Sequence, residues 1–305
     1  MYDLAIIGGG PAGAAAGVYA ARKKIKSVLI TDFFGGQSLV SADIQNWIGV
    51  PSISGLDLGK ALENHLRAQE GIEIIEGNFV TTIEKNEIGF SLKTDQNKTI
   101  EVKTVLITSG SHHKKLGVPG EEKLNGKGVA FCSTCDAPLF KDKNVAVIGG
   151  GNSGLEAVLD LQPYARKIYL LHRSENLKGD PVTAEKIKTD SKATIIFNVE
   201  VQKFIGEDSV LGLEYKDKAS GAIKKIDVEG IFVEVGSAPN SNFVKNLLDL
   251  NKWGEIVVDH KTQRTSVTGI WAAGDVTDVI YKQNNISVGD AIKGVLNIYD
   301  FLKLK

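Results

Sequence analysis

The only two cysteines of this chain, Cys132 and Cys135, lie in one short stretch, FCSTCD. Two cysteines are too few for a disulfide framework, and a structural zinc site would need two further Cys or His ligands at characteristic spacing. None of the five histidines lies at such a spacing, so we predict no metal site. Two residues between the sulfurs close a small ring that opens easily, and a nearby acid or helix terminus can tune the thiolate. The spacing therefore favours a redox-active pair over two cysteines that only pack.

A glycine-rich loop near the N-terminus is typical of a dinucleotide site. The apolar run 2–7 (YDLAII) predicts a buried parallel strand, and the Ala-rich stretch 14–24 predicts a helix. Gly8, Gly10 and Gly13 stand between them in G-x-G-x-x-G spacing. In such a loop the first glycine permits a tight turn and the second lets pyrophosphate approach the backbone. The third allows the helix to pack closely on the strand.

An acid follows the strand after this loop. Residues 27–30 predict that strand, and Asp32 lies about 20 residues beyond the glycines, where an acid can bind the ribose hydroxyls. The residues predicted at the first dinucleotide site are Gly8, Gly10, Pro11, Ala12, Gly13 and Asp32.

The same pattern occurs again in the middle of the chain. The strand-like run 144–148 (NVAVI) leads into Gly149, Gly151 and Gly154, and a helical segment and the strand-like run 167–171 follow. The chain thus contains an internal repeat of a βαβ unit, and we predict that it binds two dinucleotides. A flavin with a nicotinamide suits the dithiol, because a flavin can accept a hydride and pass electrons on to a disulfide.

Alternating apolar residues after each unit predict small β-meanders. These segments are residues 72–75, 81–84, 90–94 and 100–102, and then 194–199, 210–216, 222–228 and 231–235. Two polar segments, 109–121 and 236–242, bracket the second unit and are typical of linkers. We predict an α/β fold of two Rossmann-like, three-layer domains. The second (113–242) is inserted into the first (1–112 and 243–305).

The composition favours a soluble protein without a nucleic-acid or membrane partner. The chain has 305 residues, enough for two domains, and its 36 Lys and Arg balance 37 Asp and Glu. No run of 18 apolar residues and no signal-peptide pattern occurs, so we expect a cytoplasmic location.

The chain resembles the thioredoxin reductase family of flavoprotein disulfide reductases, especially the reductase portion of the alkyl hydroperoxide reductase flavoprotein. The motifs that carry the resemblance are GGGPAG, FFGGQ, DIQNWIG, ITSG, CSTCDAPLF, GGGNSGLEA, GIWAAGD and YKQ. The resemblance implies FAD in the discontinuous domain, NAD(P)H in the inserted domain, and electron flow through the cysteine pair to a protein disulfide. Homodimers are common in this family.

The resemblance also assigns site residues. It implies that Asp275 binds the ribityl chain of the flavin, that Asn46 contacts the isoalloxazine, and that Gln283 lies near the flavin pyrimidine. The further flavin residues implied are Gly35, Gly36, Gln37, Gly110, Gly274 and Lys282. The residues implied at the second nucleotide site are Gly149, Gly151, Asn152, Ser153, Gly154, Arg173 and Lys178.

Within the dithiol, the resemblance implies that Cys135 is the flavin-side sulfur and that Cys132 attacks the partner disulfide. Asp136 follows Cys135 directly and can protonate a departing thiolate, although an acid at this position can also be a helix cap.

Two departures from the family bear on the electron donor and acceptor. Where the family reads His-Arg-Arg-x-x-x-Arg, this chain reads HRSENLK, with Ser174 and Lys178 in place of two arginines. A guanidinium at Arg173 suits the 2′-phosphate of NADPH, whereas Glu175 leaves NADH possible. No thioredoxin-like part precedes Met1, so we expect the electrons to pass to a separate thioredoxin or glutaredoxin-like protein.

Several other functions remain open at this stage. An NADH-dependent reductase serving a peroxiredoxin and a ferredoxin-dependent flavin reductase are alternatives of the same fold. A redox-sensing module without turnover, or an oxidase that makes peroxide from oxygen, would belong to a different class.

Overall fold

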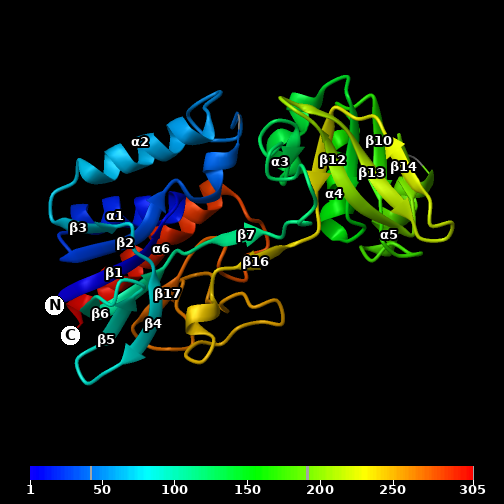
Figure 1. The fold of residues 1–305 in the computed structure, drawn as a ribbon. Helices are drawn as coiled ribbons and strands as arrows, with labels where there is room; N and C mark the ends of the chain where they lie inside the picture. Colours follow the sequence, from blue (N-terminus) through cyan, green and yellow to red (C-terminus); the bar gives the residue numbers. More distant parts are fainter. Residues whose placement is uncertain (42, 190–191, 305) are drawn as a thin grey trace. The chain divides into compact units, whose positions relative to one another are not determined.

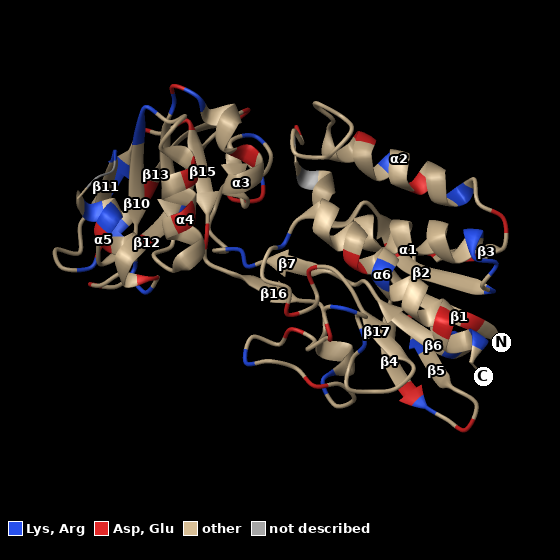
Figure 2. Cartoon of the chain, turned by 180° about the vertical axis from the view of Figure 1, so that it is seen from behind, with Lys and Arg blue, Asp and Glu red and all other residues tan. Residues whose placement is uncertain are grey.

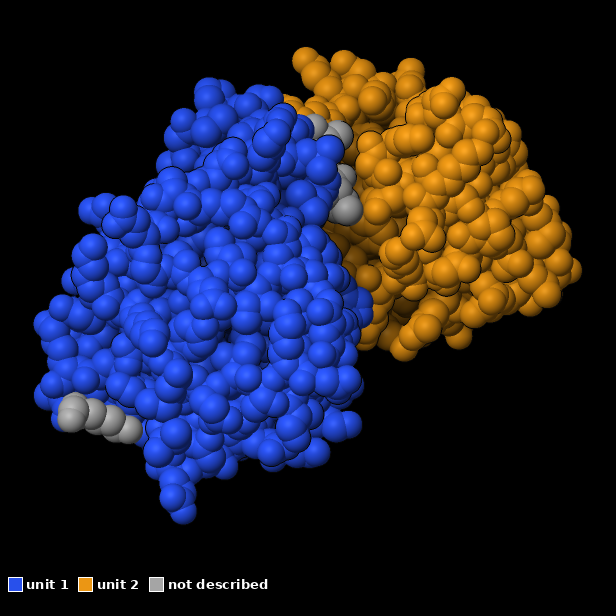
Figure 3. Space-filling model, turned by 60° about the vertical axis from the view of Figure 1, so that its left-hand side comes forward, with its two compact units in different colours: residues 1–39, 47–112, 238–305 blue, residues 40–46, 113–237 orange. Residues whose placement is uncertain are grey.

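The computed structural model describes residues 1–41, 43–189 and 192–304 and divides the chain into two compact units (Figures 1 and 3). Unit 1 comprises residues 1–39, 47–112 and 238–305, and unit 2 comprises residues 40–46 and 113–237. The chain returns to unit 1 earlier than the predicted boundary at Phe243. Each predicted linker contains a short strand, and these two strands, β7 (Ser111–His113) and β16 (Ser237–Pro239), pair with each other.

Unit 1 is built on a seven-stranded sheet of order β3-β2-β1-β6-β5-β4, with β17 beside β6. Its strands are β1 (Tyr2–Gly9), β2 (Ser27–Phe34), β3 (Ile72–Glu76), β4 (Val80–Lys85), β5 (Phe90–Thr94), β6 (Thr99–Ile107) and β17 (Ile270–Ala272). Its helices are α1 (Pro11–Arg22), α2 (Gly55–Arg67) and α6 (Asn284–Lys303), with short 3-10 turns η1 (Gly36–Val40) and η3 (Asn242–Val244). All pairs are parallel except those of β4 and β5, as expected for a βαβ unit followed by a meander.

The central strand β1 has apolar side chains on both faces, which is why its sequence is a continuous apolar run. Leu4 and Ile6 pack with residues of α1 and α6, two helices that lie side by side (Figure 1). Ala5 and Ile7 belong to the cluster on the other face, with Phe90 of the meander. Two covered faces give the three layers of the prediction.

Unit 2 repeats this plan on a parallel five-stranded sheet of order β11-β10-β9-β15-β8. Its strands are β8 (Val129–Ala130), β9 (Asn144–Ile148), β10 (Lys167–Leu171), β11 (Ala193–Ile196) and β15 (Gly230–Val233). Helices α3 (Ser133–Asp136), α4 (Asn152–Leu161) and α5 (Pro181–Thr189) and the 3-10 turn η2 (Ala137–Phe140) complete the βα part. The antiparallel sheet of β12 (Val199–Gly206), β13 (Val210–Asp217) and β14 (Ile223–Ile226) is its meander.

Three segments predicted in the meanders belong to the parallel sheets instead. β3 pairs with β2, and β15 lies between β9 and β8. Residues 194–199 are two elements, because the chain turns at Asn198, which has a φ of +55°, between β11 and β12. β3 and β11 are edge strands and only half-buried, so polar residues occur among their apolar ones, as in antiparallel strands.

Basic and acidic positions are interspersed in both units (Figure 2), in line with the balanced composition. Within the described part of the chain, no helix is both long and apolar enough to cross a membrane.

Candidate active site

The first glycine loop joins β1 to α1 and has the geometry of a phosphate-binding turn. Gly8 has a φ of +112°, and a Cβ added at Gly13 would lie 1.8 Å from the carbonyl oxygen of Gly8. At Gly10, by contrast, an added Cβ would meet only the Cα of Gly36, at 3.9 Å. The outer glycines are therefore needed for the turn and for close packing, whereas the middle one leaves the backbone accessible. No side chain caps α1, whose N-cap is Gly10, so its first N–H groups suit an anion.

The second glycine loop, between β9 and α4, repeats these features. Gly149 has a φ of +128°, and a Cβ at Gly154 would lie 1.9 Å from the carbonyl oxygen of Gly149. A Cβ at Gly151 would meet nothing within 4 Å, and no side chain caps α4 at this residue. Both loops therefore fit a dinucleotide pyrophosphate. Ser153 is exposed on the first turn, while Asn152 accepts a hydrogen bond from the N–H of Asp180 at 2.7 Å and so anchors the following loop.

Residues predicted at the flavin come together around the first loop from distant parts of the sequence. The N–H of Gly35 donates to the carbonyl of Gly9 at 3.0 Å, and a Cβ at Gly274 would lie 3.4 Å from that of Ala12. Asp32 lies in the exposed end of β2. Gln37 lies in η1 and donates to Ser111 Oγ at 3.2 Å, while the carbonyl of Gly110 accepts from the N–H of Asn240 at 2.9 Å.

Asp275 is a partly buried acid in this group. Burial raises its pKa, and Ser287 Oγ donates to its carboxyl at 3.1 Å. Lys282 donates to the Asp275 carbonyl at 3.2 Å and forms an ion pair with Glu255 at 2.9 Å, so the loop before α6 is fixed. Gln283 is the N-cap residue of α6. Asn46 lies in segment 40–46, which belongs to unit 2, and its contact with the flavin stays a prediction.

Cys132 and Cys135 form a disulfide at the start of the short helix α3 in unit 2. Asp136 is the last residue of α3 and stands at the N-cap position of η2, where its side chain makes no capping hydrogen bond. Burial raises the pKa of Asp136 to about 6, and the carboxylate of Asp43 contributes to the same rise. A carboxyl group with this pKa exchanges a proton near neutral pH.

Exposed cations gather beyond β10, at the edge where the second loop lies. Arg173 and Lys178 are both exposed, and Lys218, from the turn after β13, donates to the carbonyl of Arg173 at 2.9 Å. His172 is buried beneath them against Gly150, where a Cβ would lie 2.6 Å from its Nδ1, and burial lowers its pKa. The positive charge of this corner therefore comes from the three cations Arg173, Lys178 and Lys218.

The sequence pattern missed Lys218, because this residue lies in a polar turn with no motif.

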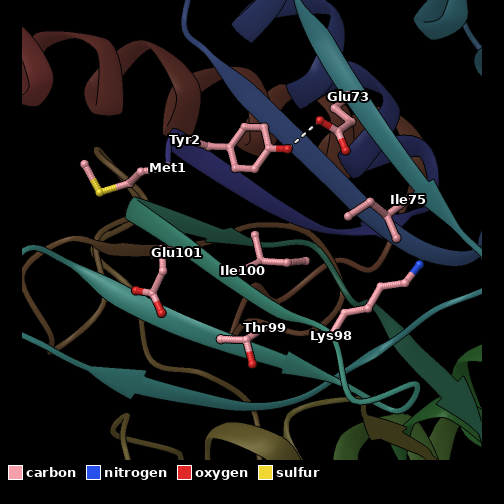
Figure 4. A pocket seen from close by; sticks show the side chains of 8 residues that line it. All are labelled: Met1, Tyr2, Glu73, Ile75, Lys98, Thr99, Ile100 and Glu101. Carbon is pink, nitrogen blue, oxygen red and sulfur yellow. Dashed lines mark hydrogen bonds between the residues drawn. The ribbon is translucent and has the colours of Figure 1, made fainter.

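The structure contains a cavity of about 520 Å³ away from the glycine loops (Figure 4). Tyr2, Thr99 and Ile100, at the amino ends of β1 and β6, line it together with Glu73, whose carboxylate accepts a hydrogen bond from Tyr2. This bond is the main reason that the pKa of Tyr2 is raised to about 12. Ligands of parallel sheets bind at the carboxyl ends of the strands, so this cavity is no candidate for either nucleotide.

Among the residues that the structure describes, no group of three or more His, Cys, Asp or Glu is arranged to hold a metal ion.

Comparison with known proteins agrees with this geometry. Residues 2–291 match the family model described as pyridine nucleotide-disulphide oxidoreductase. The chain is 40% identical over 301 residues to the F subunit of alkyl hydroperoxide reductase from Staphylococcus aureus strain Mu50, covering 99% of this chain and 59% of that protein. The chain thus spans less than two thirds of the length of this curated relative.

Solved thioredoxin reductases share the fold over their full length. The enzyme from Streptococcus pyogenes superposes with a TM-score of 0.94 at 32% identity, covering 100% of this chain and 99% of that one. The enzyme from T. acidophilum has a TM-score of 0.68 at 37% identity, covering 99% of both chains. Proteins of this family use FAD and NAD(P)H. The chain therefore belongs to the pyridine nucleotide-disulphide oxidoreductase family, as a thioredoxin reductase-like flavoprotein similar to the F subunit of alkyl hydroperoxide reductase.

Proposed function

We propose that this chain is a reductase that passes electrons from NADPH, through FAD and the Cys132–Cys135 pair, to a disulfide of another protein. The observation that carries the proposal is a disulfide spanning only two intervening residues, in the same unit as the second glycine loop. We assign FAD to the first loop and the nicotinamide nucleotide to the second. The bound flavin would accept a hydride and pass two electrons to the disulfide.

The residues of the chain would then bind the two nucleotides, orient the flavin and supply a proton to the cysteine pair. The N–H groups at the start of α1 and α4 would hold the two pyrophosphates, and Asp275 would bind ribityl hydroxyls. Opening the disulfide takes two electrons and two protons, and Asp136 is the group beside it that exchanges a proton near neutral pH. Cys135 is assigned as the flavin-side sulfur and Cys132 as the sulfur that attacks the partner.

The cations beyond β10 support NADPH as the donor. Arg173, Lys178 and Lys218 together present three positive charges where an adenosine ribose would lie after this strand. Glu175, also exposed, is the feature that would favour NADH.

The proposed acceptor is a thioredoxin or glutaredoxin-like protein, because the solved thioredoxin reductases match this chain over their full length. A peroxiredoxin system with NADH as donor is the second candidate, and the 40% identity to the alkyl hydroperoxide reductase flavoprotein favours it. We further propose a cytoplasmic homodimer.

Anaerobic titration of the purified yellow protein tests these assignments. NADPH should bleach the flavin absorbance near 450 nm at a concentration about tenfold lower than the concentration of NADH that is needed. Addition of an oxidised thioredoxin should then restore the absorbance. In the Cys132→Ser variant, bleaching should persist while reoxidation by thioredoxin is lost. A protein without flavin, or a variant that still reduces thioredoxin, would refute the proposal.

A further inference from the structure

The two residues between the cysteines are held by a carboxyl group from another helix. Ser133 Oγ donates to Asp160 Oδ2 at 2.8 Å, and Thr134 Oγ1 donates to the same oxygen at 3.3 Å. Ser133 is only 7% exposed, so its hydroxyl has little access to water and depends on this bond. Asp160 lies in the last turn of α4, the helix that begins at the second glycine loop. The dithiol segment is thereby fixed to the proposed nucleotide helix.

A second carboxyl group lies beside the same segment, at the end of a sheet strand. Glu234 directly follows β15, and its carboxyl lies close to the backbone N–H of Ser133. Its own carbonyl oxygen lies against Gly149, where a Cβ would come within 2.1 Å of it. Glu234 therefore contacts both the dithiol helix and the first glycine of the second loop.

Glu234 faces other acids from both neighbouring helices. Asp160 and Glu156 lie on α4, and Asp136 lies on α3. Burial, followed by the charges of Asp160 and Glu156, raises the pKa of Glu234 to about 8. At neutral pH Glu234 therefore carries a proton, which it loses above about pH 8.

We propose that Asp160 and Glu234 are positioning residues for the dithiol, holding α3 in the conformation of the disulfide and setting the balance between disulfide and dithiol. This inference rests on the proposed function, in which the pair is repeatedly reduced and reoxidised. Neither residue need touch a sulfur atom. The hydrogen bonds to Asp160 favour the disulfide conformation, and negative charge beside the sulfurs disfavours thiolate, so both effects oppose reduction.

The test is a thiol–disulfide equilibrium measured on the full-length, flavin-loaded protein. The protein is equilibrated anaerobically with reduced and oxidised dithiothreitol, and the free thiols are alkylated and counted by mass. In this exchange the S–S bond opens to two thiols, while one dithiothreitol dithiol gives up two electrons and two protons and closes to its cyclic disulfide. The measurement requires neither NADPH nor a protein acceptor.

Asp160→Asn keeps the shape of the side chain but removes its charge. We expect the equilibrium constant to move toward the dithiol about tenfold, or about 30 mV for a two-electron couple. Ser133→Ala removes only the donor hydroxyl and should move the equilibrium constant in the same direction. This variant keeps the proposal testable if Asp160→Asn folds poorly. The matched control is Glu156→Gln, which loses the same charge one turn earlier on α4 and should move the equilibrium by less than about threefold. The proposal is overturned if Asp160→Asn and Ser133→Ala both stay within about twofold of the parent, the spread of ordinary surface changes.

Glu234→Gln provides the pH arm of the test, because glutamine imitates the protonated acid at every pH. Parent and variant should agree at about pH 6–7 and separate at about pH 9, where the parent should favour the disulfide about threefold more than the variant. A separation that is the same at all pH values would overturn the role of Glu234. If the parent disulfide does not exchange at all, the proposed function itself fails and this inference fails with it.

Discussion

Arg173 and Lys178 follow β10 closely, and both side chains are exposed to solvent. The guanidinium of Arg173 can bind a phosphate through two parallel hydrogen bonds, which an ammonium group cannot do. The carbonyl of the same residue accepts from Lys218, so the backbone of this corner is fixed while the guanidinium remains available for a ligand. Selectivity for the coenzyme should therefore depend most on this one side chain.

Arg173→Ala should raise the KM for NADPH about tenfold or more, because a charge-assisted phosphate contact stabilises binding by about 1.5–3 kcal/mol. The KM for NADH should change by less than about twofold, since NADH has no phosphate at that position. Arg166→Ala is the matched control, because Arg166 lies just before the other end of β10 and pairs with Glu229. Equal changes for the two nucleotides in Arg173→Ala would remove this residue from the phosphate site.

At the scale of elements, the two strand–loop–helix segments share the same packing constraint. In each, the third glycine of the loop lies so close to the carbonyl of the first that a methyl group cannot fit, at Gly13 and at Gly154. The strand and the helix can then approach each other, which directs the helix N-terminus at the loop. This constraint acts on the packing of the helix against the strand, and no ligand-binding side chain takes part in it.

Gly154→Ala should lower the affinity for the nicotinamide nucleotide at least about tenfold, because α4 must move away from β9 to relieve the contact. Flavin content should stay at the parent level, since the first loop is unchanged. Gly289→Ala is the control for a helical glycine: it lies in α6, its added Cβ meets nothing within 4 Å, and alanine should stabilise that helix by about 0.5–1 kcal/mol. Calorimetric titration with NADPH checks the first effect, and an unchanged dissociation constant would contradict it.

At the scale of the whole molecule, each unit has its own apolar cores. Unit 1 holds two clusters, one on each face of its sheet, and unit 2 holds two of its own. The chain contains three tryptophans, Trp47, Trp253 and Trp271, and all of them lie in unit 1. Tryptophan fluorescence therefore follows unit 1 alone, whereas far-ultraviolet circular dichroism follows both units.

In urea, each unit should show its own unfolding transition, and each transition should respond to the nucleotide that the unit binds. NADPH at about 100 times its dissociation constant should stabilise unit 2 by about 2.7 kcal/mol and shift the dichroism transition, with little effect on tryptophan fluorescence. Removal of the flavin should instead lower the midpoint of the fluorescence transition. Fluorescence and dichroism transitions that shift together with either ligand would show that the units unfold as one and would contradict this prediction.

The sequence by itself determined the features that are local in the chain. A strand, a glycine turn and a helix occupy about 20–30 consecutive residues, so the pattern of Gly8 to Gly13 and of Gly149 to Gly154 predicts its own geometry. The α/β class, the internal repeat and the pairing of two closely spaced cysteines follow from such short stretches, and the structure and the comparisons confirm them.

Only the tertiary structure decided which distant residues meet. The edge strands β3 and β11 contain polar residues because they are only half-buried, and no local signal places them in the parallel sheets. Their pairing with β2 and β10 does so. The contact of Lys218 with Arg173 and the hydrogen bond from Ser133 to Asp160 join residues far apart in the chain. Such contacts depend on the packing of whole elements, which the periodicity of one element does not encode.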